Sequence, residues 1–510
     1  MSKVLILDFG SQYTQLIARK VRELGVYSEI VPFNVPVSRI REEKPGALIL
    51  SGGPQSVYEK GAPLPSSGIF DLGIPVLGIC YGLQVMAHLL GGKVVPSGKR
   101  EYGFASLKVL DRKGLLSGVT GGCQVWMSHG DKPARIPSGY RITASTSNTR
   151  VAAVEDAGRR FYGVQFHPEV IHTKQGKKIL GNFLFRLAGL EADWSMASFI
   201  EKKVKEIRDA TAGGRIICGL SGGVDSLVTS LIIHKAVGRM LTCIFVDNGL
   251  LRKSQFQELM NDFRRKCELK VVGVDASDQF VKALRGVVSP EQKRKIIGGL
   301  FIEIFEREAK KIGGAEFLAQ GTIYPDVIES NPVKGPSSVI KSHHNVGGLP
   351  KGLRFKLIEP LKELFKDEVR ALAVELGMDK DFVQQHPFPG PGLAVRIVGE
   401  VNRESLEIVR EADEILLQEI RRAGLYNRLW QAFAVLLPVR SVGVMGDQRT
   451  YQRVVVLRIV QSTDGMTANW YPVPHALLAR ISTRIVNEVK GVNRVVYDIT
   501  TKPPGTIEWE

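Results

Sequence analysis

Long apolar runs are missing from this sequence of 510 residues. No uninterrupted apolar stretch reaches the length of about 20 residues that a membrane-spanning helix needs. The first apolar run covers residues 4–7 and ends at Asp8, which is too short for the core of a signal peptide. We therefore expect a cytoplasmic protein that does not act at a membrane.

Cysteine is scarce, and internal repeats and low-complexity tracts are missing. The chain has five cysteines, an odd number, and no Cys-x-x-Cys pair. This pattern argues against a disulfide framework and against a structural zinc site. Any one of these cysteines is most simply a small buried apolar residue, and Cys218 and Cys243, in strand-like runs, fit that interpretation.

Acidic residues are outnumbered, with 52 Asp and Glu against 69 Lys and Arg, so the net charge is +17. The basic pairs are scattered and form neither a tail nor a stripe interleaved with aromatic residues. Scattered charge is weak evidence for a nucleic-acid footprint. We expect a surface that attracts anionic small molecules and no nucleic-acid partner. An RNA-binding protein is the alternative from a different functional class.

Strand-like and helix-like segments alternate over most of the chain, which predicts an α/β fold with parallel sheets wrapped by helices. We predict two doubly wound parallel-sheet domains, residues 1–190 and 191–385. In the first we expect a helix at 12–24 and strands at 4–7, 47–50, 76–79 and 161–166. The second begins with an amphipathic helix closed by Gly213-Gly214, followed by strands at 215–220, 241–246 and 316–319.

A Pro/Gly-rich joint at residues 386–392 precedes the last part of the chain. Beyond it we expect helices at 404–423 and 475–489 and strands at 440–445, 454–459 and 494–497. This order predicts a smaller α+β domain over residues 386–510.

A cysteine nucleophile is predicted at Cys80, in the segment Gly78-Ile79-Cys80-Tyr81-Gly82, where a strand meets a helix. The glycines permit a sharp turn, and the amino terminus of the helix favours a thiolate and supplies N–H groups for an oxyanion. His167 follows another strand and is the candidate base, with Glu169 placed to orient its ring. Gly52-Gly53-Pro54 follows a third strand and can supply a further oxyanion N–H group.

These segments, in this order, resemble the class I glutamine amidotransferase domain over about residues 1–190. The resemblance implies that Cys80 attacks glutamine, that His167 is the base and Glu169 its partner, and that ammonia is released through a thioester. It assigns the oxyanion and glutamine-binding roles to Gly52, Gly53, Tyr81 and Gln84.

A second Gly-rich turn, Ser221-Gly222-Gly223-Val224-Asp225-Ser226, follows a predicted strand and opens a helix. Such a turn lets N–H and hydroxyl groups approach phosphate oxygens, and it is not a Walker A loop because no Gly-Lys-Ser/Thr follows. It resembles the pyrophosphate-binding loop of the N-type ATP pyrophosphatases, which have an adenine nucleotide alpha hydrolase-like fold. Leu227 stands where that family often has a small hydroxyl residue, which leaves this seventh ATP-binding position open.

The rest of the ATP site is predicted from neighbouring strand ends. Asp225 is the candidate residue for placing Mg²⁺ on the pyrophosphate of ATP. The segments 245–249 and 321–322 can border the adenosine.

The acceptor of the ammonia is predicted from the carboxyl-terminal half. Segments 341–350, 388–393, 446–451 and 501–510 resemble the GMP synthase family, and the resemblance extends over essentially the whole chain. It implies a C–N ligase of purine biosynthesis that adenylylates xanthosine monophosphate (XMP) at O2 and aminates it to GMP. It also implies that residues 341–350 form a lid over ATP and that the domain after about residue 386 forms a homodimer.

The predicted XMP site follows from this resemblance. Arg449 and Lys502 can pair with the phosphate of XMP, and Glu508 can accept hydrogen bonds from its ring or ribose. The complete set is Gly390, Gly392, Arg449, Lys502, Thr506, Ile507 and Glu508. No metal site is assigned to His343 and His344, because adjacent residues of an extended segment point opposite ways. A relative that amidates nicotinate adenine dinucleotide is the alternative within this class, and the tail 501–510 argues against it.

Overall fold

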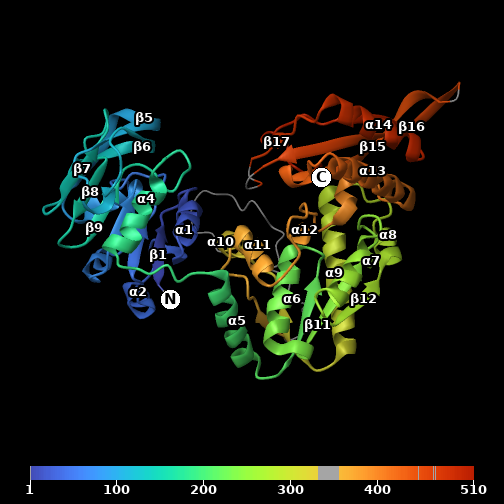
Figure 1. Ribbon diagram of the computed structural model, residues 1–510, viewed down its shortest axis with the longest axis horizontal. Coiled ribbons are helices and arrows are strands. Elements are labelled where there is room, and N and C mark those ends of the chain that lie inside the picture. Colours follow the sequence, from blue (N-terminus) through green and yellow to red (C-terminus); the bar gives the residue numbers. More distant parts are fainter. Residues whose placement is uncertain (1, 331–354, 446, 463–464, 466) are drawn as a thin grey trace. The chain divides into compact units, whose positions relative to one another are not determined.

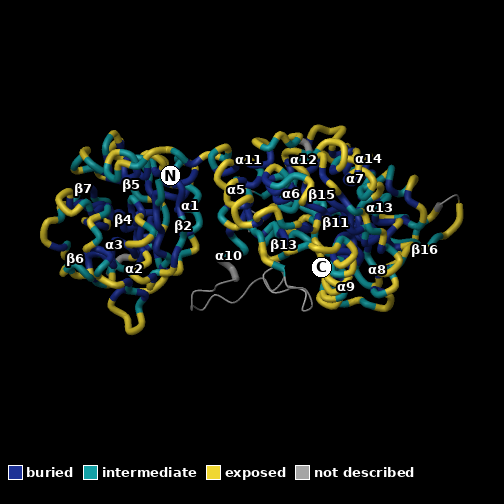
Figure 2. The backbone as a smooth tube through the Cα atoms, turned by 90° about the horizontal axis from the view of Figure 1, so that it is seen from below, coloured by how far each residue is buried: buried dark blue, intermediate teal, exposed yellow. Residues whose placement is uncertain are grey.

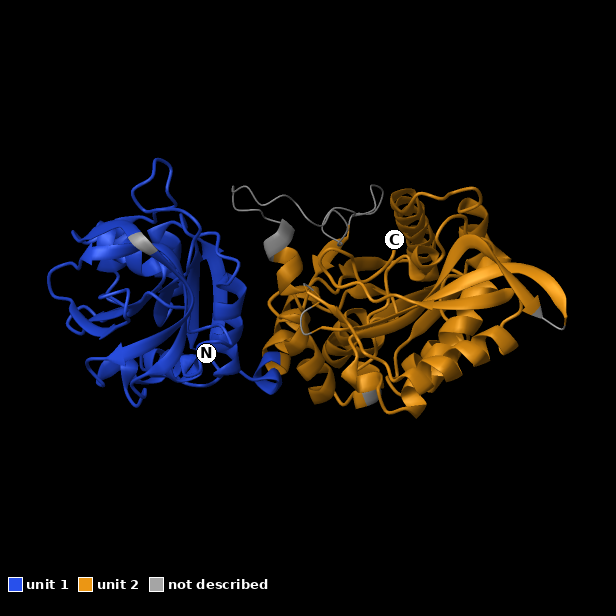
Figure 3. Cartoon of the chain, turned by 90° about the horizontal axis from the view of Figure 1, so that it is seen from above, with its two compact units in different colours: residues 1–199, 331–340 blue, residues 200–330, 341–510 orange. Residues whose placement is uncertain are grey.

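A computed structural model describes residues 2–330, 355–445, 447–462, 465 and 467–510. These residues form two compact units, and the second begins at Ile200 (Figure 3). The predicted lid at residues 341–350 lies outside the described residues, as does Gly446. None of the helices in the described part of the chain combines the length and the apolar composition needed to cross a bilayer.

The first unit, coloured blue to teal in Figure 1, is built on a sheet whose strand order is β2-β1-β3-β4-β9-β8-β7-β5-β6. Neighbours from β2 to β9 are parallel, and those from β9 to β6 are antiparallel. The strands are β1 Lys3–Asp8, β2 Tyr27–Pro32, β3 Ala47–Leu50, β4 Val76–Ile79, β5 Lys93–Val109, β6 Cys123–Arg135, β7 Arg141–Ser145, β8 Ala153–Asp156 and β9 Phe161–Val164. The helices are α1 Thr14–Glu23, α2 Val37–Glu43, α3 Tyr81–Leu89 and α4 Gly176–Gly181.

Every residue of β3 and β4 is buried, as expected for strands of a parallel sheet that is covered on both faces. The strands predicted at 47–50 and 76–79 have these same bounds in the structure. The strand predicted at 161–166 ends earlier, at Val164, and the chain beyond it turns toward the site described below.

The second unit contains a parallel sheet in the order β12-β11-β10-β13-β14. Its strands are β10 Arg215–Leu220, β11 Leu241–Asp247, β12 Val271–Asp275, β13 Ala315–Ala319 and β14 Lys356–Ile358. The helices of this region are α5 Met196–Thr211, α6 Val224–Val237, α7 Gln255–Arg265, α8 Ser277–Ala283, α9 Pro290–Ile312, α10 Tyr324–Ser330, α11 Lys366–Glu375 and α12 Lys380–Val383. Two parallel-sheet regions in an α/β chain confirm the predicted fold class.

The carboxyl-terminal part carries a second sheet dominated by a long antiparallel ribbon. The ribbon pairs β15 Gln431–Met445 with β16 Gln448–Gln461, and β16 also pairs with the short β17 Asn469–Trp470 and with β18 Val492–Tyr497. Helices α13 Arg403–Arg422 and α14 His475–Glu488 belong to the same region. The predicted strand at 440–445 is only the outer end of β15, so the sequence pattern missed its inner half.

The parallel sheet and the carboxyl-terminal sheet share one hydrophobic core, which reaches from Ile244 on β11 to Val492 on β18. Figure 2 shows the buried residues running along β11 and β15. Gly392 lies in this shared region with a positive φ of 62°, and a Cβ there would lie only 2.4 Å from the carbonyl oxygen of Leu250. The Pro/Gly-rich joint therefore packs against the parallel-sheet region, and a separate domain after residue 386 stays a prediction.

Candidate active sites

The thiol of Cys80 lies at the turn between β4 and α3. Cys80 has a positive φ of 53°, a costly conformation for a residue with a side chain. Glycine is required on both sides, because a Cβ at Gly78 would lie 2.7 Å from the carbonyl group of Gly82, and one at Gly82 would lie 2.2 Å from that of Leu50. The turn thus places the sulfur at the amino terminus of α3, where unpaired N–H groups favour a thiolate.

His167 and Glu169 lie beyond the end of β9 and form a buried pair, with Nδ1 of His167 2.7 Å from Oε1 of Glu169. Burial opposes protonation of the imidazole. The carboxylate of Glu169 and the hydrogen-bonded thiol of Cys80 outweigh burial, so the pKa of His167 lies well above its ordinary value. The structure therefore brings together the three residues predicted as nucleophile, base and orienting carboxylate.

The two glycines after β3 border this group. A Cβ at Gly52 would lie 3.1 Å from Cε1 of His167, and a Cβ at Gly53 would lie 3.1 Å from the ring of Tyr81. The hydroxyl group of Tyr81 donates a hydrogen bond to the carbonyl oxygen of Pro63 at 3.1 Å. The side-chain hydroxyl group of Tyr81 is therefore already engaged, which leaves its backbone N–H group for the predicted oxyanion role.

Strand β6 and the end of β9 add contacts that the sequence motifs did not indicate. The thiol of Cys80 donates to the carbonyl oxygen of Ser128 at 3.5 Å, and Nε2 of Gln84 donates to that of Asp131 at 3.1 Å. Nε2 of the fully buried Gln165 lies 3.7 Å from the sulfur of Cys80. No local motif marks Gln165, because β9 ends at Val164 and the chain bends between that strand and His167.

The Gly-rich turn between β10 and α6 is held by its own hydroxyl groups. The hydroxyl of Ser226 accepts from the N–H of Ser221 at 3.1 Å and donates to the carbonyl of Gly223 at 3.0 Å. Gly222 has a positive φ of 79°. Because the first N–H groups of a helix have no acceptor within it, the start of α6 at Val224 offers donors for phosphate oxygens.

Asp225 and Lys366 bring opposite charges to this turn. Nζ of Lys366, at the start of α11, lies 2.5 Å from Oδ2 of Asp225. The other carboxylate oxygen of Asp225 is buried and has no hydrogen-bond partner in the described part of the chain. An available carboxylate oxygen beside a phosphate-binding turn fits Mg²⁺, which proteins bind through one or two carboxylates together with substrate phosphates. Lys366 was not predicted, because no local motif marks it.

Leu227 contributes no polar side chain to the ATP site. Its side chain is 1% exposed, and its N–H donates to the carbonyl oxygen of Gly223 at 3.3 Å. The predicted adenosine segment at Gly321 does reach the turn, since a Cβ there would lie 3.2 Å from the backbone of Asp225. Among the residues that the structure describes, no cluster of three or more His, Cys, Asp or Glu side chains suits a metal ion.

The carboxyl-terminal tail is fixed by two buried arginines. Arg458 donates to the carbonyl oxygens of Thr506 and Ile507 at 2.9 and 3.3 Å. Arg396 donates to both carboxylate oxygens of Glu508, from Nε at 3.2 Å and from Nη2 at 3.0 Å. The predicted residues 506–508 are thereby brought to the loop that carries Gly390 and Gly392.

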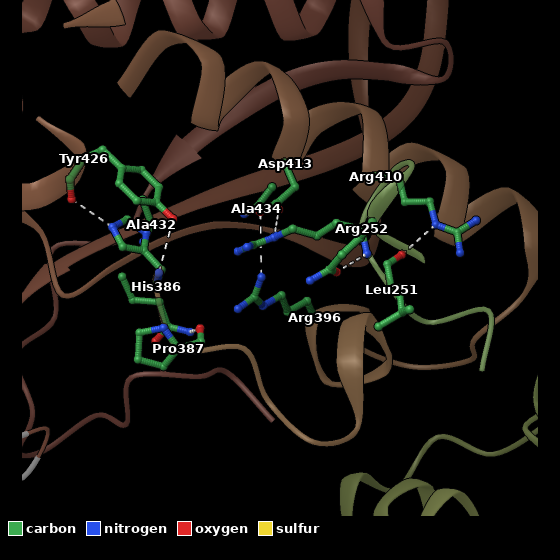
Figure 4. Close-up of polar contacts among 12 residues, drawn as sticks. Leu251, Arg252, His386, Pro387, Arg396, Arg410, Asp413, Tyr426, Ala432 and Ala434 are labelled. Carbon is green, nitrogen blue, oxygen red and sulfur yellow. Dashed lines mark hydrogen bonds and ion pairs between the residues drawn. The ribbon is translucent and has the colours of Figure 1, made fainter. Parts of the chain in front are cut away.

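A further set of polar contacts joins this loop to the segment that follows β11 (Figure 4). Asp413 on α13 accepts a hydrogen bond from Nε of Arg252 at 2.8 Å and lies 3.8 Å from Nη1 of Arg396. Both guanidinium groups stand over the ring of Phe388, at 5.0 and 5.2 Å from its centroid. Arg410 donates to the carbonyl oxygen of Leu251 at 3.0 Å. These contacts hold the Pro/Gly-rich joint against the segment that follows β11.

Arg449 and Lys502 are not brought together within one chain. Lys502 pairs with Ala468 next to β17, and β17 pairs with β16 at Val460. Arg449 lies at the opposite end of β16, beside the turn of the ribbon. At about 3.3 Å per residue, the strand between Arg449 and Val460 spans roughly 35 Å. The two predicted phosphate ligands cannot reach one phosphate from the same chain.

Comparisons with known proteins match the whole chain. A family model described as glutamine amidotransferase class-I matches residues 5–187, and one described as GMP synthase C terminal domain matches residues 418–509. A protein of Chlorobium chlorochromatii named GMP synthase [glutamine-hydrolyzing] is 57% identical and is covered over 100% of both chains. One of the same name from Phenylobacterium zucineum is 58% identical over 99% of this chain and 98% of its own length.

A solved structure of a GMP synthase component from Thermoplasma acidophilum is 31% identical, with a TM-score of 0.35, over 37% of this chain and 94% of that chain. The full-length matches carry the assignment, since they extend over all the segments on which the predicted resemblance depended. The chain belongs to the glutamine-hydrolysing GMP synthase family.

Proposed function

We propose that this protein makes GMP from XMP, ATP and glutamine, with ammonia formed at Cys80 and consumed beside the Ser221–Ser226 turn. The observation that carries the proposal is the Cys80–His167–Glu169 arrangement in a chain that matches glutamine-hydrolysing GMP synthases over its full length. Residues described above can be assigned a role in each half of the reaction.

In the first half-reaction, Cys80 is the nucleophile. His167 takes the proton of the thiol, the sulfur attacks the side-chain amide carbon of glutamine, and the oxyanion is stabilised by N–H groups near Gly52 and Tyr81. His167 then protonates the departing ammonia, which leaves a thioester. Water deprotonated by His167 cleaves the thioester to glutamate, while Glu169 holds the imidazole in one orientation.

In the second half-reaction, O2 of XMP attacks the α-phosphorus of ATP and pyrophosphate departs. The hydroxyl groups of Ser221 and Ser226, the first N–H groups of α6 and the ammonium group of Lys366 bind and orient the pyrophosphate part of ATP. Asp225 is the residue that would hold Mg²⁺, which neutralises phosphate charge when bound. Ammonia then adds to C2 of the purine, AMP departs with O2, and loss of a proton gives GMP.

The direct test is a product assay. Purified protein is incubated with XMP, ATP, MgCl₂ and glutamine, and the nucleotides are separated by chromatography. GMP, AMP and pyrophosphate are expected in equal amounts. ATP cleavage without formation of GMP would exclude XMP as the acceptor, and formation of a different amidated product would identify the alternative relative.

We also propose that the active form is a homodimer assembled through the ribbon of β15 and β16. Val442 and Val444 are two residues apart on β15, so their side chains lie on the same face of the ribbon. On β16, Tyr451 faces Val442 and Arg449 faces Val444, so all four side chains share this face. The three apolar side chains are exposed, Val444 by 75%. A second copy packed on this face would bury them and would bring Arg449 to an XMP site that its own chain cannot reach.

Complementation between chains tests this arrangement. Arg449→Ala and Lys502→Ala chains are each expected to lose GMP synthesis at low XMP concentration. When the two are mixed and allowed to exchange partners, half of the sites in each mixed dimer contain both intact residues, so activity should return. No recovery in mixed dimers that mass spectrometry has verified would exclude a site shared between two chains.

A further inference from the structure

One wall of the glutaminase site is the backbone of β6 around Ser128 and Asp131. The carbonyl oxygen of Ser128 lies 3.5 Å from the sulfur of Cys80, and that of Asp131 accepts a hydrogen bond from Gln84 at 3.1 Å. Gln84 is on α3, one helical turn after the nucleophile. The position of this short piece of β6 therefore sets the space beside the thiol.

The sheet is interrupted beside this piece of β6. β5 pairs with β6 on both sides of the interruption, but the register shifts between Pro96, which faces Asp131, and Glu101, which faces His129. β5 therefore bulges away from β6 next to Gly130, and the regular ladder of backbone hydrogen bonds is broken there. Pro96, which faces Asp131, has no N–H group to offer its carbonyl oxygen, so that oxygen is restrained by side-chain donors.

A buried glutamate and histidine supply that restraint. Nδ1 of His129 lies 2.9 Å from the carbonyl oxygen of Asp131, and its Nε2 lies 3.4 Å from Oε2 of Glu101. Both carboxylate oxygens of Glu101 also accept hydrogen bonds from hydroxyl groups, one from Thr146 at 2.9 Å and one from Thr149 at 2.6 Å. Glu101 is 6% exposed and His129 is 4% exposed.

The positions of the protons follow from these partners. A carbonyl oxygen only accepts, so Nδ1 of His129 carries a hydrogen and donates it to Asp131. Nε2 then faces the carboxyl group of Glu101, and it makes no hydrogen bond within the described residues. Two facing lone pairs in a buried site repel, so the carboxylate of Glu101 favours a proton on Nε2 of His129. Burial lowers the pKa of His129, and the charge of Glu101 opposes that shift.

We propose that Glu101 is a positioning residue for glutamine, which acts through His129 on the carbonyl group of Asp131 and so on Gln84. The inference rests on the proposed glutaminase function of Cys80. Glu101 contacts His129 and the two threonines and not the thiol, so its loss is expected to disturb the glutamine pocket more than the chemistry. A merely structural role predicts lower stability with an unchanged KM for glutamine.

Glu101→Gln tests the proposal because it keeps the shape of the side chain and removes its charge. Glu155→Gln is the matched control, since Glu155 is equally buried in the same unit but contacts Arg141 and Leu115 instead of β6. Glu101→Gln is expected to raise the KM for glutamine about tenfold and to change kcat less than about threefold. Synthesis from ammonium chloride should stay unchanged, and the control should keep the wild-type KM.

Two reagents separate the pocket from the thiol. Iodoacetamide alkylates Cys80 without first binding in the glutamine pocket, whereas 6-diazo-5-oxonorleucine must bind in that pocket as glutamine does. In Glu101→Gln, inactivation by the glutamine analogue should slow about tenfold, and alkylation should keep its rate. An unchanged KM, or equal slowing by both reagents, overturns the proposal. A wild-type protein without glutaminase activity refutes the proposed function instead, so the two failures are distinguishable.

Thr149 offers a second test that removes no buried charge. Thr149→Val deletes the hydroxyl group that donates to Glu101, and Thr149→Ser restores it. The valine variant is expected to raise the KM for glutamine about threefold and the serine variant to return it to the wild-type value. If Glu101→Gln does not fold, an unaltered KM in Thr149→Val overturns the proposal.

Discussion

The substitution Glu169→Gln removes one charge from the glutaminase site and leaves its shape unchanged. Oε1 of Glu169 lies 2.7 Å from Nδ1 of His167, and both side chains are buried. With the two charges centred about 4 Å apart and an effective dielectric constant of about 20, the carboxylate stabilises the imidazolium by up to about 4 kcal/mol. The side-chain amide introduced at position 169 still accepts a hydrogen bond from His167. We therefore expect transition-state stabilisation to fall by about 2–4 kcal/mol, which lowers the glutamine-dependent rate roughly 30-fold to 1,000-fold.

The pH dependence of alkylation provides the second measurement. Loss of Glu169 lowers the pKa of His167, so the imidazolium that stabilises the thiolate of Cys80 is lost at a lower pH than in the wild type. Alkylation of Cys80 by iodoacetamide should therefore require a higher pH in the variant. Synthesis of GMP from ammonium chloride should be unaffected, and Glu155→Gln serves as the control. An equal loss with glutamine and with ammonium chloride would refute the reasoning, as would a wild-type alkylation profile.

Three further predictions test other parts of the molecule. Cys80→Ala should lower glutamine-dependent synthesis about 10⁴-fold or more and leave ammonium-dependent synthesis intact, and loss of both would contradict separate sites. Burial lowers the pKa of His386 to about 4, so it contributes stability that is present above about pH 6.5 and is lost as the pH falls. Urea unfolding should therefore show that His386→Gln removes about 2 kcal/mol of the destabilisation between pH 7 and pH 5, and an unaltered acid dependence would exclude His386 as its source. Lys293→Met leaves the carboxylate of Glu510 without its buried ammonium partner and should lower the free energy of unfolding by about 3–5 kcal/mol. Adding Glu510→Gln to this variant should restore part of that loss. A melting temperature equal to that of the wild type would contradict this.

The elements that the sequence predicted best are three short strands, which precede the turns at Gly52, Cys80 and Ser221. β3, β4 and β10 have the predicted bounds, because a short, mainly apolar run that ends at a turn of small residues leaves few alternatives. β15 was predicted only in part, since its inner half is buried on both faces and shows no alternation that marks a strand. The predicted lid lies outside the described residues.

The family and the candidate thiolate site could be predicted because their determinants are local. Gly78, Cys80 and Gly82 encode a turn through the space that a Cβ would need, and the Ser221–Ser226 turn closes on its own hydroxyl groups. His167 and Glu169 are two residues apart. Such a pattern can be recognised in the sequence because the role of each residue depends on residues that are close to it in the chain.

Only the tertiary structure determined which distant residues complete these sites. Gln165, Lys366 and Glu101 reach their partners through strand order, helix packing and an interrupted ladder, and none of these features leaves a local pattern. The same reason explains Arg449 and Lys502, which are both basic and have the same predicted ligand but lie near opposite ends of β16. Residue types and short spacings thus determined the chemistry, whereas the register and length of a strand decided which side chains can act on one substrate.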